Sequence, residues 1–544
     1  MNIFQPKVFS TLRNYSKKQF VNDLVAGVIV AIIALPLSIA LAIASGVSPE
    51  KGIYTAIVAG FVIAFLGGSS VNISGPTAAF ATIVAGIVAQ FGTSGLVVAT
   101  IMAGIILIIM GVCRFGSLIK YIPHTITTGF TSGIALTIVI GQVKDFLGLT
   151  FPEGMPTVET AEKAEAIVKS IGTFNWQALL VGAAALAILI VWPKISKKIP
   201  GSLVAVVLGV VAVKAFDLQV NTVGDLYSIS RSLPAFELPS FSFDTVKQLL
   251  PSACTIAILA GIESLLSCVV SDGMINDRHN SNTELIAQGF GNICSGLFGG
   301  IPATGAIART AANVKNGGRT PVAGMVHAAV LLLVLVVLMP YAAWIPMPVI
   351  AAILFMVAYN MCEWRQFVKI CKTAPKSDII VLVITFVLTV VFDLVVAIAV
   401  GMIIAVVLFM KRMADVANVR IWTQNTEDAP DSERLKTVPE NTVVVEFDGP
   451  MFFASSEKFN TIPVDEGVKT VILRMRNVPS LDSTAMRALY EIYWTCKKSG
   501  LNLILSHTNE QPLSAMKKAG FYDELGAENF LPNIDEALSY AQTL

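Results

Sequence analysis

The dominant pattern in this chain of 544 residues is a series of long apolar runs separated by short polar stretches. Runs such as 179–191, 328–338 and 394–409 contain no charged residue. An apolar run of about 20 residues spans the hydrocarbon layer of a membrane as a helix. One such run is compatible with the core of a soluble protein, but about a dozen in one chain predict a polytopic membrane protein.

The apolar windows and their breakers predict fourteen membrane segments, seven before about residue 218 and seven after about residue 246. Two of them, 76–91 and 305–316, are too short and too rich in glycine and threonine to span a membrane alone. The expected segments are 22–45, 51–67, 76–91, 95–113, 122–143, 176–193, 201–216, 247–271, 284–299, 305–316, 321–340, 343–361, 377–392 and 394–411. An odd number of segments per half makes the halves antiparallel, which predicts an inverted repeat.

The pattern changes after residue 412, where polar residues predict a linker and then β-rich runs alternate with helical ones. This alternation predicts a small C-terminal α/β domain. Its strands are expected at 442–447, 469–475 and 501–506, and its helices at 482–499 and 510–519. The predicted parts are an N-terminal segment (1–21), a transport domain (22–412), a linker (413–440) and the α/β domain (441–544).

Composition agrees with a membrane protein, because 54% of the residues are hydrophobic and 14% are charged, against about 25% charged in soluble domains. The formal net charge of +1 gives no basic surface for nucleic acid. The seven cysteines form no CxxC pair, so neither a metal nor a cofactor is expected. The first twenty residues are polar and basic, so the first apolar segment is expected to be a retained anchor.

Basic residues cluster between alternate segments and before the first one. Positively charged loops stay on the cytoplasmic side. Both termini are therefore expected in the cytoplasm, with the chain in the cell membrane. The polar residues at the same end of segments eight and nine are expected to form a solvated loop, with a gate as the alternative: Asp272, Asp277, Arg278 and Glu284.

The two short segments occupy the third position of each half, and each opens with a glycine among small and hydroxyl residues. A helix start has unpaired N–H groups and a partial positive charge, so it binds anions. Two such starts facing each other predict an anion site near the midplane of the membrane. Its expected residues are Ser74, Gly75, Thr77, Ala78, Thr304, Gly305 and Ala306. The alternative is close packing of helices through small residues.

Two charged side chains, Glu263 and Arg309, lie inside otherwise apolar or small segments. A charge at the centre of a bilayer costs at least ~2.5–3.5 kcal/mol, so it usually faces a cavity or a partner. We expect Arg309 to attract the anion and Glu263 to bind a coupling proton. Ser267, one turn after Glu263, is expected to help hold water or a cation. The alternative is a structural ion pair between Glu263 and Arg309.

At these residues the chain resembles the SulP (sulfate permease) family, which is related to the solute carrier 26 anion exchangers. The similar segments are 34–36, 45–55, 73–78, 278–285, 308–314 and 317–321. Residues 481–485 resemble the STAS domain of anti-sigma-factor antagonists. The resemblance implies a 7+7 inverted repeat, a bacterial inner-membrane homodimer, and a core domain that moves against a gate domain with the anion between segments three and ten. It implies substrates such as sulfate, bicarbonate, chloride and dicarboxylates.

Four positions modify this expectation. Leu37 stands where family members often have glutamine, and Ile307 with Arg309 differs from the sodium-coupled bicarbonate members. Ile307 offers no side-chain oxygen to sodium, which favours protons as the coupling ion. Thr484 matches a serine that is phosphorylated in antagonist STAS domains, so it is a regulatory candidate. The alternative is that Thr484 simply starts a helix beside Asp482.

The expected function is secondary active transport of a small anion of the sulfate, bicarbonate or C4-dicarboxylate class, by proton symport and an elevator-like movement. Alternatives are sodium-coupled bicarbonate symport, anion exchange and an anion channel. A membrane-tethered signalling protein, in which the C-terminal domain binds a cytoplasmic protein partner, is a further class. An enzyme is not expected, because the soluble domain has no nucleophile–base pair.

Overall fold

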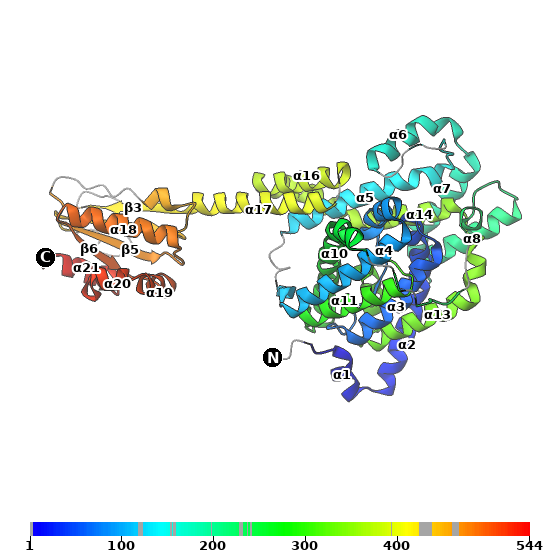
Figure 1. The fold of residues 1–544 in the computed structure, drawn as a ribbon, viewed down its shortest axis with the longest axis horizontal. Coiled ribbons are helices and arrows are strands. Elements are labelled where there is room, and N and C mark those ends of the chain that lie inside the picture. Colours follow the sequence, from blue (N-terminus) through cyan, green and yellow to red (C-terminus); the bar gives the residue numbers. More distant parts are fainter. Residues whose placement is uncertain are drawn as a thin grey trace. The chain divides into compact units, whose positions relative to one another are not determined.

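The computed structural model divides the chain into two compact units, Met1–Met402 and Ile403–Leu544, and each is treated by itself (Figure 1). The described residues are 4–117, 123–152, 155, 159–196, 199–227, 232–236, 238–239, 242–392, 394–423, 438–459 and 467–544.

The first unit is almost entirely helical. All fourteen predicted segments appear as helices or helix arms, the last of them in α17, which runs from the first unit into the second, and this confirms the predicted membrane fold. The first half contains α2 (Lys17–Ala44), α3 (Pro49–Leu66), β1 (Ser74–Gly75), η2 (Ala78–Phe80), α4 (Ala81–Val112), α5 (His124–Leu147), α7 (Trp176–Ile195) and α8 (Gly201–Ala215). The second half contains α10 (Phe243–Ile275), α11 (Ser281–Leu297), β2 (Thr304–Gly305), α12 (Ile307–Lys315), α13 (Val322–Ala342), α14 (Met347–Cys362), α16 (Lys376–Val391) and α17 (Leu394–Val416).

Short elements connect these helices: α1 (Lys7–Thr11), η1 (Leu12–Asn14), α6 (Thr160–Ser170), η4 (Ile171–Thr173), α9 (Val223–Leu226) and α15 (Trp364–Thr373). The helix α4 contains both the third and the fourth predicted segments. They are separated at Gly92, whose φ of 68° lies in the left-handed region that glycine tolerates. The short arm before Gly92 is the counterpart of α12 in the second half.

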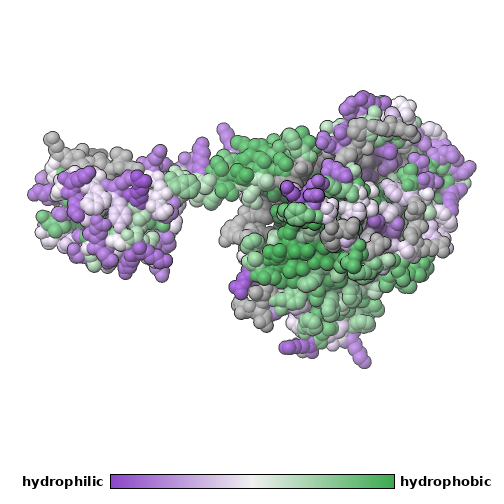
Figure 2. Space-filling view, viewed as in Figure 1, coloured by the Kyte–Doolittle hydropathy of each residue, from purple (hydrophilic) through white to green (hydrophobic). Residues whose placement is uncertain are grey.

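Among the described residues, nine helices are long and apolar enough to cross a membrane. Apolar side chains cover the middle of the first unit over α10, α11 and α16 in Figure 2, while hydrophilic ones gather near α6 and α1. The hydrocarbon layer of a bilayer solvates such an apolar belt. The chain is therefore a multi-pass membrane protein.

Helix packing repeats between the two halves. α4 packs on α11 as α13 packs on α3, and α10 packs on α4 as α2 packs on α13. In the same way, α16 packs on α5 as α7 packs on α14, while α5 and α14 pack on each other. In each comparison, the second helix pair is obtained from the first by replacing every helix with its counterpart in the other half. This is the arrangement that an inverted repeat produces.

Two groups of helices are visible in this packing. The first group consists of α2, α3, α4, α10, α11, α12 and α13, which pack closely on one another. The second consists of α5, α7, α8, α14 and α16, which do the same. Contacts between the groups are sparser, and α2 makes several of them, with α8 and α14.

The second unit contains a five-stranded sheet of order β3-β4-β5-β6-β7, in which only the β3–β4 pair is antiparallel. Side chains alternate along the strands, so Val443 and Val445 face one core, and Val444 faces the other. The elements are β3 (Asn418–Trp422), β4 (Thr442–Asp448), η6 (Ser456–Phe459), β5 (Thr470–Asn477), α18 (Ser483–Lys498), β6 (Asn502–Ser506), α19 (Glu510–Lys518), α20 (Phe521–Leu525), η7 (Ala527–Asn529), β7 (Phe530–Leu531) and α21 (Ile534–Ala541). The predicted α/β domain is confirmed.

A lysine of η6, Lys458, contacts the end of α17. Lys458 Nζ donates to the carbonyl oxygens of Ala414 and Ala417, both at 2.8 Å. A cation at a helix C-terminus satisfies carbonyls that have no partner inside the helix. Strand β3 follows α17 directly and lies within the predicted linker 413–440. The sequence did not predict this strand, because only one of its side chains is buried and its residues therefore show no apolar alternation. Residues 424–437 of that linker lie outside the described part, and the domain boundaries stay predictions.

Candidate functional site

The two short segments meet in a two-stranded ribbon. Ser74 pairs with Gly305 and Gly75 with Thr304 in antiparallel register. The N–H of Ala306 also donates to Ile73 O at 2.8 Å. The sequence places these residues in different halves of the chain, and the ribbon brings the starts of the two short helices together.

Both helix starts lack a side-chain cap. Thr77 precedes η2 and Ala306 precedes α12, and neither side chain bonds to the first backbone N–H groups. The first hydrogen bond into α12 runs from Thr310 N to Ala306 O, at 2.8 Å. N–H groups at such a start have no intrahelical acceptor and carry a partial positive charge. The ribbon therefore holds two electropositive helix ends close to each other.

Arg309 adds a full positive charge to this place. Its side chain is only 3% exposed, and its Nη2 donates to Pro76 O at 2.8 Å. Its Nη1 has no hydrogen-bond partner within the described part of the chain. A Cβ at Gly75 would lie 2.7 Å from this Nη1, so the glycine leaves the space that the guanidinium fills. A buried cation without a carboxylate partner is costly unless a ligand supplies the negative charge.

Glu263 reaches the same place from α10. Thr77 Oγ1 donates to Glu263 Oε2 at 3.1 Å, and the two side chains, like that of Ala306, are partly exposed. Ala78 beside them is buried. The ion pairs found among the described residues do not include one between Glu263 and Arg309. The carboxylate is therefore held by the Thr77 hydroxyl.

Two predicted residues, Thr304 and Gly305, fix the ribbon to α10. Thr304 Oγ1 donates to Ala260 O at 2.9 Å and lies 2.8 Å from Ser264 Oγ. The N–H of Gly305 donates to the same Ser264 Oγ at 2.9 Å. The Thr304 hydroxyl is therefore engaged by the protein in this conformation. Ser264 was not predicted, and its position next to Glu263 is the only sequence signal for it.

Ser267 lies one turn further along α10, in a buried polar cluster. Its hydroxyl donates to Asn72 Oδ1 at 2.7 Å and to Thr310 Oγ1 at 3.1 Å. Thr310 Oγ1 in turn accepts from Ile73 N at 3.0 Å. In the structure Ser267 therefore joins α10 to the chain just before β1.

Polar side chains spaced four residues apart on α11 form hydrogen bonds with the ribbon and the chain segments that lead into it. Gln288 Nε2 donates to Ser74 Oγ at 2.9 Å, and Asn292 pairs with both backbone groups of Ala303, each at 2.9 Å. The third member, Glu284, accepts from Gly68 N at 2.9 Å and Ser69 N at 3.2 Å. It also accepts from Asn72 Nδ2 at 2.8 Å and Gln288 Nε2 at 3.1 Å.

The expectation of a solvated loop is wrong for Glu284, whose side chain is fully buried. The spacing of Glu284, Gln288 and Asn292 was the available signal, because residues i, i+4 and i+8 share one helix face. The polar residues around Glu284 suggested a loop instead, since Glu284 lies only three residues after the start of α11.

The regulatory candidate Thr484 is exposed in the first turn of α18. Asp482 is the N-cap of this helix and accepts from Ala485 N at 2.8 Å. Its other oxygen accepts from Phe453 N at 3.0 Å. The helix start is thus capped by Asp482, and the Thr484 side chain is accessible on the surface of the second unit.

Residues 20–385 match the family described as the sulfate permease family. This chain belongs to that family. Residues 434–537 match the STAS domain, so the second unit contains a STAS domain. Sulfate permease family members are transporters rather than enzymes, and this chain is an anion transporter of the family.

Two bacterial relatives align over almost the whole chain. A protein of Bacillus subtilis named as sulfate transporter YvdB is 39% identical over 96% of this chain and 98% of its own length. The bicarbonate transporter BicA of Picosynechococcus is 32% identical over 95% of this chain and 94% of its own length. The sulfate permease family thus contains similar chains whose names give different anions.

Two solved structures have the same fold. The structure of SLC26A9 superposes with a TM-score of 0.88 at 21% identity, over 99% of this chain and 92% of that chain. The transmembrane domain of a cyanobacterial BicA superposes with a TM-score of 0.63 at 32% identity, over 72% of this chain and 98% of that chain.

Proposed function

We propose that this protein is a secondary active transporter that carries a small oxyanion, sulfate or bicarbonate, together with a proton. The anion binds between the starts of η2 and α12, beside the Arg309 guanidinium. The observation that carries this proposal is the buried Arg309, whose Nη1 has no partner and which pairs with no carboxylate of the described chain. An anion with several oxygens satisfies that N–H and the uncapped backbone N–H groups at once.

The coupling proton binds Glu263 in this proposal. A carboxyl group in a membrane-embedded site tends to be neutral when it has no ion-pair partner, and the hydrogen bond found for Glu263 within the described part of the chain comes from the Thr77 hydroxyl. Protonation removes a negative charge next to the anion, so the proton and the anion favour each other's binding. Ile307 lies beside the site with an apolar side chain, which supports a proton rather than sodium.

The movement in this proposal is a displacement of one helix group against the other. The site is built from α10, α11, α12, β1, β2 and η2, which all belong to or connect the first group. Its internal hydrogen bonds would therefore persist while contacts to α8 and α14 change. We further propose that both termini are cytoplasmic and that the chain forms a homodimer, as its family resemblance implies.

Replacing Arg309 by glutamine tests the anion site. Initial uptake of radiolabelled sulfate or bicarbonate into proteoliposomes should fall about tenfold or more, since a hydrogen bond to a charged group contributes about 1.5–3 kcal/mol. Arg365→Gln, which changes an exposed arginine on α15, is the matched control and should keep its uptake. A panel of sulfate, bicarbonate and fumarate identifies the substrate. Normal uptake by a folded Arg309→Gln variant would remove the site from consideration.

Replacing Glu263 by glutamine tests the coupling. The wild-type protein should take up more anion when the outside is more acidic than the inside, and the variant should lose this response while it still exchanges internal for external anion. Asp244→Asn, at an exposed position on the same helix, should respond as the wild type does. If the Glu263→Gln variant follows the pH gradient unchanged, or if a sodium gradient drives uptake instead, proton coupling through Glu263 is wrong.

A further inference from the structure

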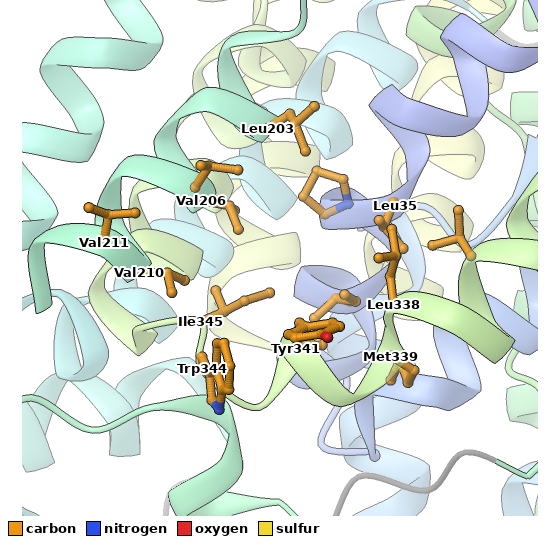
Figure 3. Close-up of a pocket in the computed structure, with 15 residues that line it drawn as sticks. Leu35, Leu203, Val206, Val210, Val211, Leu338, Met339, Tyr341, Trp344 and Ile345 are labelled. Atoms are coloured by element: carbon orange, nitrogen blue, oxygen red, sulfur yellow. The ribbon is translucent and has the colours of Figure 1, made fainter. Parts of the chain in front are cut away.

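An apolar cavity of about 270 Å³ lies in the membrane-spanning part. Side chains of α8, such as Val206 and Val210, form one wall, and Leu35 of α2 with Leu338 of α13 forms the other (Figure 3). Tyr341 and Trp344 close one end. None of the residues that carry the anion site lines it.

This cavity lies at the boundary between the two helix groups. α2 and α13 belong to the first group, and α8 belongs to the second. α8 packs closely on α14 at Gly209, where a Cβ would lie only 2.6 Å from the Val349 side chain. Pro36 of α2 also lines the cavity. A proline inside a helix removes a backbone hydrogen bond and bends the helix. Near Pro36, α2 therefore borders the cavity, although α2 and α8 also make direct contacts.

The apolar side chains that line the cavity indicate which kind of molecule would bind there. Cavities lined by aliphatic side chains offer water no partners, and one of about 150 Å³ stays dry and takes up apolar molecules. The rim is open to the surroundings, since Val207 and Val211 are 52% and 57% exposed. In a membrane those surroundings are hydrocarbon. From Leu203 to Val211 the wall extends for about 12 Å along α8, which suits a section of a lipid acyl chain.

One end of the cavity has the features of the membrane–water interface. Tyr341 and Trp344 pack edge to face with their ring centres 5.2 Å apart, and the Nζ of the exposed Lys214 lies 2.9 Å from the centre of the Trp344 ring. Tryptophan and tyrosine gather at the headgroup level, and lysine side chains reach toward that level. Lys214 is thus a cation beside the mouth of the cavity, where a lipid phosphate would lie.

The geometry points to a phospholipid site, in which one acyl chain fills the cavity between α8 and the α2–α13 pair and the phosphate lies at Lys214. The lipid occupies the boundary between the two helix groups and fills space that would otherwise be empty there. This inference is independent of the substrate and of the coupling ion.

Photolabelling of the full chain tests this site. The protein is reconstituted in vesicles containing phosphatidylglycerol with a diazirine in one acyl chain, irradiated, and its labelled peptides are identified by mass spectrometry. Label is expected on the cavity-facing residues of α8 and α13. Val207→Trp fills the cavity and should lower that label about fivefold, whereas Leu208→Trp should not, since Leu208 is exposed on the same helix outside the cavity. Lys214→Gln should lower the label about fivefold, because a lysine near the surface contributes about 1 kcal/mol to anionic lipid binding.

Equal labelling of Val207→Trp and Leu208→Trp would mean that only the annular lipid is labelled, and would overturn the site. Unchanged labelling of Lys214→Gln would overturn the phospholipid as occupant, as would stronger labelling by a free fatty acid with the same diazirine. Leu338→Trp, with Val337→Trp as its control, repeats the test on α13. If one cavity variant fails to fold, the other still tests whether the cavity binds lipid. Because the readout is lipid labelling, failure of the transport proposal leaves this test intact.

Discussion

At Gly75 the absence of a side chain determines where a charge lies. A Cβ added there would meet Arg309 Nη1 at 2.7 Å, while its next neighbours in Ala56 are at 3.6 and 3.7 Å. The contact is with the far end of a flexible side chain, so the guanidinium can move away at small cost to the fold. The position of the positive charge would change, although the protein would remain folded.

Gly75→Ala should therefore lower the rate of anion uptake, by about tenfold if one hydrogen bond to the charged group is lost, with little change in thermal stability. The matched control is Gly86→Ala, since a Cβ there meets nothing within 4 Å. That substitution should keep full uptake and stabilise the helix by about 0.5–1 kcal/mol. Uptake and unfolding temperature are measured on the same proteoliposome preparations. An active Gly75→Ala variant would show that Arg309 does not need this position.

Residues of the site differed in how visible they were along the chain. Glu263 and Arg309 were recognisable because a charge inside an apolar segment needs a functional or structural reason. Ser264, Asn72 and Gln288 were not, because uncharged polar residues are common in such segments and their partners lie far away in the sequence. Thr304 was expected to face the anion, and the structure instead engages its hydroxyl with α10.

At the scale of an element, α11 is the support of the site. Its polar face bonds to both chain segments that lead into the ribbon, at Gly68–Ser74 and at Ala303. Four donors converge on the buried Glu284 carboxylate, and none of the four is a cation. Removing an acceptor from such a cluster leaves buried N–H groups without partners, which costs free energy.

Glu284→Gln should lower the free energy of unfolding by about 2 kcal/mol, because the new amide N–H₂ would face N–H donors in place of one oxygen. Thermal unfolding in detergent measures this loss, and Glu363→Gln at an exposed position provides the control. Apparent substrate affinity should weaken as well, since the ribbon loses an anchor. If both variants unfold at the wild-type temperature, the α11 cluster does not hold the ribbon.

On the scale of the whole molecule, the fold consists of two antiparallel halves whose helices regroup into two packed sets. A half contributes helices to both sets, so the sets could not be derived from the order of segments. They follow from which faces pack, as in the contact of α4 with α11 and its counterpart of α13 with α3. The STAS domain is more local, because its parallel strands β4, β5 and β6 and their helices follow one another in the chain.

The sequence by itself determined the membrane class, the fourteen segments, the two short helices and the α/β domain. These follow from apolar length, from helix breakers and from side-chain period, which are properties of consecutive residues. Only the tertiary structure decided that Ser74 pairs with Gly305, that Glu284 is buried and that an apolar cavity lies between α8 and the α2–α13 pair. Those facts depend on contacts between residues far apart in the chain, and only the burial of Glu284 had a local signal, its spacing from Gln288 and Asn292.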